Sequence, residues 1–202
     1  GKPLAVSAPV VSLWANPQVL GEDIEQAKQV AQNLGLPEVE FLERLARLKN
    51  KEFMYLKRSV NPVEAEAVLS NNWNGVHGVQ EFQRYYPAAE VATHLVGFNN
   101  IDDQGQEGME LAYEPWLQGT SGKKVVQKDR TGRTVKDLQL LSSAQPGKDL
   151  TLSIDLRMQY VAYRELKAVV QQHKASSGSA VVLDVQTGEI LAMVNQPAYN
   201  PN

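Results

Sequence analysis

The hydrophobic pattern of this chain changes repeatedly between the two-residue period of a strand and the 3.6-residue period of a helix. An alternating, valine-rich segment at 4–14 predicts a strand, and apolar residues at helical spacing predict helices over 22–34 and 37–48. Asn61-Pro62 is typical of a helix start and predicts a helix that extends to about residue 69. Strands and helices in mixed order favour an α+β fold built from short elements.

The rest of the chain continues with short elements and one break. We expect a short strand at 53–56, an extended segment at 76–86, short helices at 87–96 and 108–117, and a polar hairpin with strands at 123–128 and 134–141. Residues 143–148 include Pro146-Gly147 and are typical of a linker, so we divide the chain into domains 1–147 and 148–202.

Beyond the linker, Ser153 is expected to cap a long helix with Asp155 in its first turn. Its apolar stripe would consist of Ile154, Met158, Tyr160, Val161, Leu166, Val169 and Val170. A hairpin with strands at 180–185 and 190–194 follows, and both strands are apolar on both faces, as in central strands that are covered on both sides. Because one helix covers only one face, we expect an exposed apolar surface that leads to self-association or local mobility.

Composition excludes several classes of protein. The 202 residues carry a formal charge of −3, and Lys and Arg are scattered among acidic residues, so nucleic acid is not an expected partner. The absence of cysteine excludes disulfides, thiol nucleophiles and Cys-ligated metals. The longest apolar stretch, at 4–15, is interrupted by polar residues and is too short to cross a bilayer. The start at Gly1 does not resemble a signal peptide, and we expect upstream sequence to have been removed.

Candidate catalytic residues are few. Ser121 and Lys124 have the S-x-x-K spacing of acyl-serine transferases, but they lie between Gly119 and a predicted strand, whereas that chemistry needs both on one helical turn. Ser121 as nucleophile with Lys124 as base therefore stays the weaker, enzymatic hypothesis. Residues 70–72 spell S-x-N, yet a helix C-terminus explains them better, and no K-T-G or K-S-G completes the set.

Metal-binding patterns are equally weak, and no cofactor is expected. His77, His94 and His173 have no ligand spacing. Residues 100–105 imitate the start of a calcium loop, but Leu111 occupies the twelfth position, which must supply a carboxylate. No catalytic or metal-binding residue is predicted.

Several short segments, taken in order, resemble one protein family. They are Gly1-Lys2-Pro3-Leu4-Ala5, Arg84-Tyr85-Tyr86-Pro87, the stretch from Gly105 to Glu110, the stretch from Lys128 to Arg133, and the final hairpin with Tyr199-Asn200-Pro201-Asn202. Together they resemble the N-terminal part of a class B penicillin-binding protein, the division-specific septal peptidoglycan D,D-transpeptidase of the penicillin-binding protein 3 type.

The resemblance implies an elongated, non-catalytic pedestal of the dimerisation type at 1–147 and the start of a transpeptidase domain at 148–202. The family's S-x-x-K, S-x-N and K-T-G motifs lie downstream of the final hairpin, so this chain is expected not to be an enzyme. Its parent would cross-link peptidoglycan stem peptides, bind β-lactams, and face the periplasm from the inner membrane through one upstream helix. Expected partners are its own transpeptidase domain and divisome membrane proteins, including the septal glycosyltransferase.

Residues of these family segments are expected to be structural or to contact partners. They are Arg84, Tyr86, Pro87, Gly105, Gly108, Glu110, Arg130 and Gly132. Glycine permits tight backbone, a glutamate near a helix start can accept hydrogen bonds, and arginine can bridge two segments. Two alternatives stay open: a stand-alone periplasmic scaffold that has lost catalysis, and the pedestal of an elongation-specific class B paralogue.

Overall fold

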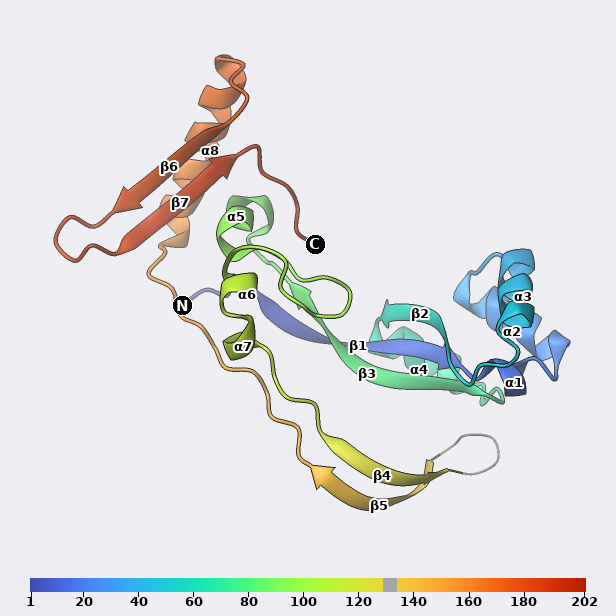
Figure 1. The fold of residues 1–202 in the computed structure, drawn as a ribbon. Coiled ribbons are helices and arrows are strands. Elements are labelled where there is room, and N and C mark those ends of the chain that lie inside the picture. The colour runs from blue at the N-terminus through green and yellow to red at the C-terminus, as the bar shows by residue number, and fades with distance from the viewer. Residues whose placement is uncertain (129–133) are drawn as a thin grey trace. The chain divides into compact units, whose positions relative to one another are not determined.

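The computed structural model describes residues 1–128 and 134–202 and combines short helices with small antiparallel sheets (Figure 1). The predicted α+β class is therefore confirmed. Two compact units are present, each assembled from separate stretches of chain: residues 1–7, 84–121 and 144–202 form the first, and residues 8–83 and 122–143 form the second. The sequence-based boundary between 147 and 148 stays a prediction.

The second unit is built on a three-stranded sheet with the order β2 (Met54–Val60), β1 (Val6–Ala15) and β3 (Val76–Tyr85), in which β1 and β2 are antiparallel. Its helices are α1 (Pro17–Leu20), α2 (Ile24–Leu34), α3 (Glu38–Arg47) and α4 (Pro62–Leu69). Leu13, Val30 and Phe41 are among the buried side chains that join β1, α2 and α3 in one core.

Local signals explain why these helices were predictable. The Asn61 side chain accepts a hydrogen bond from the Val63 N–H, with Pro62 in the first turn of α4, as the sequence predicted. The α2 helix ends at Gly35, which adopts φ +64°. Strand β2 extends four residues beyond the predicted 53–56, because the charged side chains Lys57 and Arg58 obscure its apolar alternation.

The polar hairpin also belongs to the second unit. Its strands β4 (Lys123–Lys128) and β5 (Thr134–Ser142) are antiparallel, as predicted. The connecting turn with Arg130 and Gly132 lies outside the described residues.

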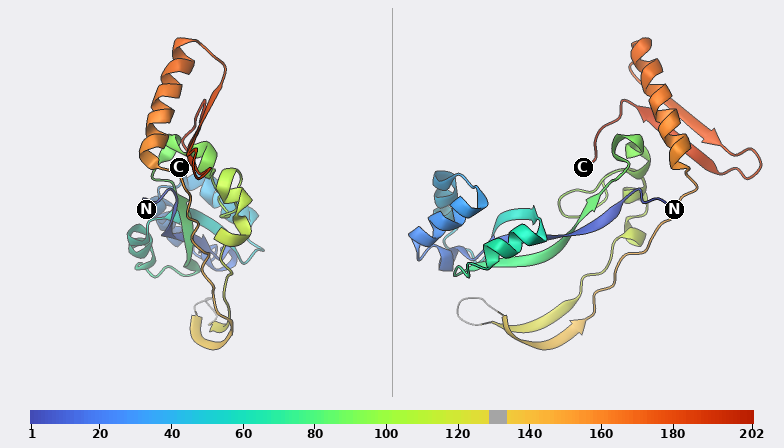
Figure 2. Two further views of the ribbon diagram at one scale, coloured as in Figure 1. Left: turned by 90° about the vertical axis from the view of Figure 1, so that its left-hand side faces the viewer. Right: turned by 180° about the vertical axis from the view of Figure 1, so that it is seen from behind.

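The first unit contains η1 (Ala89–Val91), α5 (Thr93–Val96), α6 (Gly108–Ala112), α7 (Glu114–Leu117), α8 (Leu156–Gln172), and the antiparallel hairpin of β6 (Gly178–Leu183) and β7 (Ile190–Gln196). The α8 helix runs along one face of this hairpin, which both views of Figure 2 show. Two predicted helices are each divided. The 108–117 segment breaks at Tyr113, because Pro115 has no N–H to donate to the Leu111 carbonyl and its ring would clash with that carbonyl in a continuous helix.

The start of α8 corrects the prediction for Ser153. Asp155 is the N-cap, and its carboxylate accepts hydrogen bonds from the backbone N–H groups of Arg157 and Met158. The hydrogen bonds from the Arg157 side chain, together with these two backbone bonds, lower the pKa of Asp155 to about 2. The Ser153 hydroxyl instead donates to the Ile190 carbonyl at 2.8 Å.

The burial of α8 also differs from the prediction. Its buried residues are Gln159 and Tyr163, whereas Met158 and Val161 of the predicted stripe are about half exposed. Strand β6 ends at Leu183, so Val185 lies in the turn and is almost fully exposed. The expected apolar surface is thus present in the described chain, and self-association stays a prediction.

Candidate functional site

A buried ion pair in the first unit joins the end of β3 to α6, and its arginine also bonds to the start of β1. Arg84 lies near the end of β3 and Glu110 lies in α6, where it is only 3% exposed. The Arg84 Nε donates to Glu110 Oε1 at 2.9 Å, and its Nη1 donates to the Ser7 hydroxyl at 3.0 Å. Burial raises the pKa of Glu110, although the Arg84 charge acts in the opposite direction. Arg84 thus contacts both α6 and the start of β1, and its structural or partner-contacting role stays a prediction.

Gly105 and Gly108 allow the backbone around α6 to pack closely. Gly108 has φ +62°, and a Cβ there would lie 2.7 Å from the backbone nitrogen of Gly97 and from the Leu95 carbonyl oxygen. A Cβ on Gly105 would lie 2.3 Å from the Glu110 carbonyl oxygen. Both positions therefore require glycine because another part of the backbone occupies the space of a side chain.

Tyr86 is a buried anchor of the same region. Its hydroxyl oxygen accepts a hydrogen bond from the Asn99 N–H at 2.9 Å, and burial raises the pKa of its phenol. Its ring packs in a small core with Ala92 and Val96. Pro87, which is exposed, occupies the turn that the Ala89 N–H closes onto the Tyr86 carbonyl. The structure thus brings together six of the eight predicted residues in one unit, which also contains Ser7.

The sequence reasoning missed further polar residues that meet this region. Asn202 Oδ1 accepts from the Tyr86 N–H at 2.9 Å, and its Nδ2 donates to the Tyr86 carbonyl at 3.2 Å. The Tyr199 hydroxyl donates to Glu107 at 2.6 Å. These residues belonged to recognised family segments, but their pairing across about a hundred residues has no local signal.

A second missed group lies between α8 and its neighbours. The Gln159 side chain is fully buried and makes hydrogen bonds to the Val91 carbonyl and to both backbone polar groups of Met193. Glu90 accepts hydrogen bonds from the Tyr163 hydroxyl at 2.6 Å and from the Lys167 amine at 3.3 Å. A polar residue outside the predicted apolar stripe thus holds η1, α8 and β7 together.

The arrangement does not support the enzymatic hypothesis for Ser121 and Lys124. Ser121 lies outside any helix or strand, and Lys124 is the second residue of β4, so they do not share a helical turn. The S-x-N segment directly follows α4, with Ser70 as the C-cap and Asn71 donating to the Ala67 carbonyl.

The calcium-like segment closes a turn. The Asn100 side-chain oxygen accepts hydrogen bonds from the backbone N–H groups of Asp102 and Gln104. Within the described residues, no group of three or more His, Asp or Glu side chains is placed to hold a metal ion. In the same part of the chain, no helix has the length and apolarity needed to cross a membrane.

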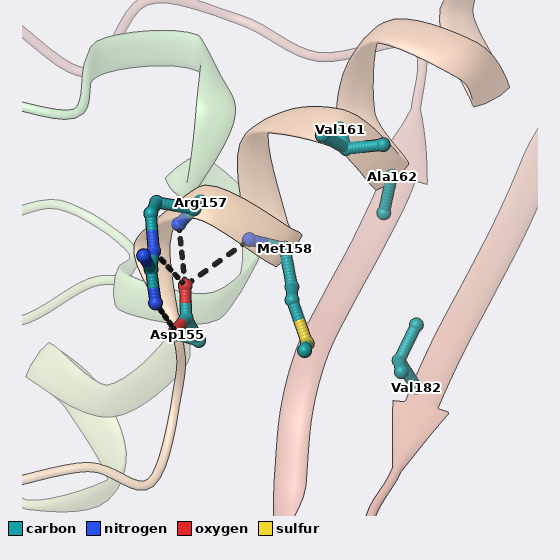
Figure 3. Close-up of a pocket in the computed structure, with 6 residues that line it drawn as sticks. All are labelled: Asp155, Arg157, Met158, Val161, Ala162 and Val182. Atoms are coloured by element: carbon teal, nitrogen blue, oxygen red, sulfur yellow. Dashed lines mark hydrogen bonds and ion pairs between the residues drawn. The ribbon is translucent and has the colours of Figure 1, made fainter.

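An apolar pocket of about 550 Å³ opens between the first turns of α8 and strand β6 (Figure 3). Met158, Val161, Ala162 and Val182 supply its apolar lining, while Asp155 and Arg157 lie at the helix start. It forms part of the exposed apolar surface and holds no pair of groups suited to acid–base chemistry.

Comparisons with known proteins agree with the resemblance. The family model of the penicillin-binding protein dimerisation domain matches residues 1–152. The chain is 44% identical over 207 residues to the peptidoglycan D,D-transpeptidase FtsI of Escherichia coli K12, covering 100% of this chain and 35% of that protein. It is 41% identical over 202 residues to the probable peptidoglycan D,D-transpeptidase PbpC of Pseudomonas aeruginosa, covering 100% of this chain and 36% of that protein.

A solved structure shares the fold. Penicillin-binding protein 2X from Streptococcus thermophilus superposes with a TM-score of 0.69 and 22% identity, covering 98% of this chain and 33% of that chain. These findings confirm the predicted resemblance to class B penicillin-binding proteins. The chain spans about a third of the length of the curated relatives described above.

Proposed function

The chain belongs to the penicillin-binding proteins that carry a dimerisation domain, and from this we propose that it is the non-catalytic pedestal of a septal peptidoglycan transpeptidase. The observation that carries the proposal is the buried Arg84–Glu110 ion pair, which ties the ends of β1 and β3 to α6. A buried, hydrogen-bonded pair between distant segments fixes their geometry, and it does not supply the serine hydroxyl that acyl-serine transfer requires.

The proposed pedestal leads into the catalytic domain of the parent protein. Residues 148–202 form one helix and one hairpin with an open apolar face, which is the condition expected of the first elements of a larger domain. The parent would cross-link peptidoglycan stem peptides on the periplasmic side of the inner membrane and be inhibited by β-lactams. The pedestal would place that domain and offer surfaces to membrane proteins of the divisome, including the septal glycosyltransferase.

Covalent labelling tests whether the chain itself is catalytic. We expect the 202-residue chain to form no covalent adduct with a fluorescent β-lactam, because Ser121 and Lys124 lack a common helical frame. The whole gene product is expected to give a labelled band under the same conditions. A stoichiometric band on the 202-residue chain that disappears in Ser121→Ala would contradict the proposal.

The role of the ion pair is tested in the whole gene product. Glu110→Ala is expected to lower stability or septal function more than the intrinsic rate of acylation, because Glu110 lies in the pedestal. Purified, folded Glu110→Ala protein that had lost acylation outright would show that this residue serves catalysis directly.

A further inference from the structure

The chain that leaves β7 turns back onto the region of the ion pair. We call residues 197–202 the strap. The Pro197 carbonyl lies 2.8 Å from His94 Nε2, the Tyr199 hydroxyl donates to Glu107, and the Asn202 side chain pairs with the Tyr86 backbone. All these residues belong to the first unit.

At the C-terminal end of the strap, the Asn202 side chain makes the two hydrogen bonds to the Tyr86 backbone that a neighbouring strand would make. Its side-chain amide satisfies both the N–H and the C=O of Tyr86, at 2.9 and 3.2 Å. Asn200 holds this arrangement in place, because its Oδ1 accepts hydrogen bonds from the Asn202 backbone N–H at 3.1 Å and from its Nδ2 at 3.2 Å. The Tyr86 N–H is therefore protected from solvent exchange only while the strap is docked.

In the middle of the strap, Tyr199 contacts the loop before α6. Its ring meets those of His94 and Phe98 edge to face, with centroids 5.3 and 5.8 Å apart, and its hydroxyl lies 2.6 Å from Glu107 Oε2. Glu107 is the N-cap residue of α6, and its carbonyl oxygen would lie 1.8 Å from a Cβ on Gly97. Such close backbone packing limits independent movement of Glu107.

Asn202 and Tyr199 of the strap attach to the same two segments that the ion pair joins. Tyr86 lies two residues after Arg84, and Glu107 lies three residues before Glu110. From this geometry we propose that the strap is a conformational coupling element, which transmits displacement of β7 to the Arg84–Glu110 pair and the reverse. Thermodynamic coupling between two contacts is reciprocal, so weakening the Tyr199 contact loosens the Asn202 contact, and the reverse. The purpose of this coupling rests on the proposed function, whereas the coupling itself does not.

The test weakens the hydrogen bond between Tyr199 and Glu107 and measures hydrogen exchange at the Tyr86 amide, which Asn202 binds. In the whole gene product, Tyr199→Phe and Glu107→Gln each weaken the bond at α6, and hydrogen exchange is followed in peptides that contain the Tyr86 amide. We expect exchange there to accelerate roughly three- to tenfold, the change that corresponds to loss of one hydrogen bond. The double variant should accelerate exchange no more than the stronger single variant. Tyr160→Phe is the control, because that hydroxyl makes none of the strap's hydrogen bonds.

Asn202→Asp provides a second, direct variant. It keeps one acceptor for the Tyr86 N–H but places an oxygen against the Tyr86 carbonyl, so exchange at the Tyr86 amide is again expected to rise. Folding of every variant is checked by circular dichroism. Unchanged exchange at Tyr86 in folded Tyr199→Phe and Glu107→Gln proteins would overturn the coupling. If coupling is present but septal function of the variants is unchanged, the strap inference stands and the proposed positioning of the catalytic domain fails.

Discussion

Replacing the Arg84–Glu110 ion pair by apolar residues, singly and together, tests how this pair contributes to the fold. At an effective dielectric constant of about 20, unit charges at the observed 2.9 Å attract by at most about 6 kcal/mol. Removing two such ions from water costs several kcal/mol each. Burial, aided by the negative charges of Asp103 and Glu114, raises the pKa of Glu110 despite the attraction of Arg84. The pair is therefore expected to contribute little net stability while fixing geometry.

The single variants should behave differently from the double variant. Glu110→Leu or Arg84→Met leaves one partly buried charge without its ion-pair partner, and each is expected to lower the free energy of unfolding by about 2–4 kcal/mol. The estimate is below the usual range for fully buried pairs, since the Arg84 side chain is 19% exposed and keeps its bond to Ser7. The double variant is expected to lie within about 1 kcal/mol of the parent, because no charge is left unpaired.

Urea unfolding measured through the first unit provides the assay. Trp116 in α7 is the reporter, with its indole N–H donating to the Asp149 carbonyl, and Trp14 and Trp73 are replaced by Phe in the reference protein and all variants. The difference between the double variant and the sum of the singles gives the coupling free energy. A double variant as destabilised as that sum would refute the reasoning.

Three other changes have defined outcomes. Burial raises the pKa of Glu110 above its ordinary 4.5, so the folded state holds this proton more tightly than the unfolded state. The natural chain should therefore lose stability relative to Glu110→Gln as the pH rises from about 4.5 through the folded-state pKa. Urea midpoints measured across this pH range report the loss. Gly108→Ala should cost about 2–4 kcal/mol, whereas Gly188→Ala, with φ +76° and open space around the new Cβ, should cost about 1 kcal/mol in the same assay. Gln159→Leu should lower the free energy of unfolding by about 3 kcal/mol or more by leaving buried backbone groups unpaired, while exposed Gln172→Leu should change it little.

Features with a local cause could be predicted from the sequence. Helix α4 begins at Asn61-Pro62 because the cap and the fixed φ of proline act within one turn. The hairpin of β6 and β7 follows from two apolar runs separated by a turn. Even here the end of the first strand was placed too late, because Val185 is apolar but belongs to the turn.

Features that depend on tertiary contacts could not be read from the sequence. Arg84 and Glu110 were identified as site residues through the family segments, but nothing local indicated that they form one ion pair. The burial of Gln159 was missed because hydrophobic periodicity assigns burial to apolar residues and gives no reason to bury an amide. Only the backbone groups of Val91 and Met193 explain it.

The exposed apolar side chains on α8 and on both faces of the β6–β7 hairpin determine how strongly the chain should self-associate. Val181, Leu183, Met158 and Val161 are each about half exposed, so each forfeits about 1 kcal/mol of burial rather than the full value. Two copies that covered these faces would gain roughly 8 kcal/mol, of which at least about 4 kcal/mol is lost to the entropy of association. The expected dissociation constant therefore lies near the millimolar range.

Light scattering of the 202-residue chain over a concentration series measures this association, with hydrogen exchange of residues 180–194 followed in parallel. We expect the apparent mass to rise at high concentration and Val181→Lys with Leu183→Lys to abolish the rise, because lysine prevents burial of the apolar face. Val63→Lys is the matched control, since Val63 is 76% exposed on α4 in the other unit. A chain that stays monomeric at millimolar concentration with residues 180–194 strongly protected would show that the hairpin face does not need a partner.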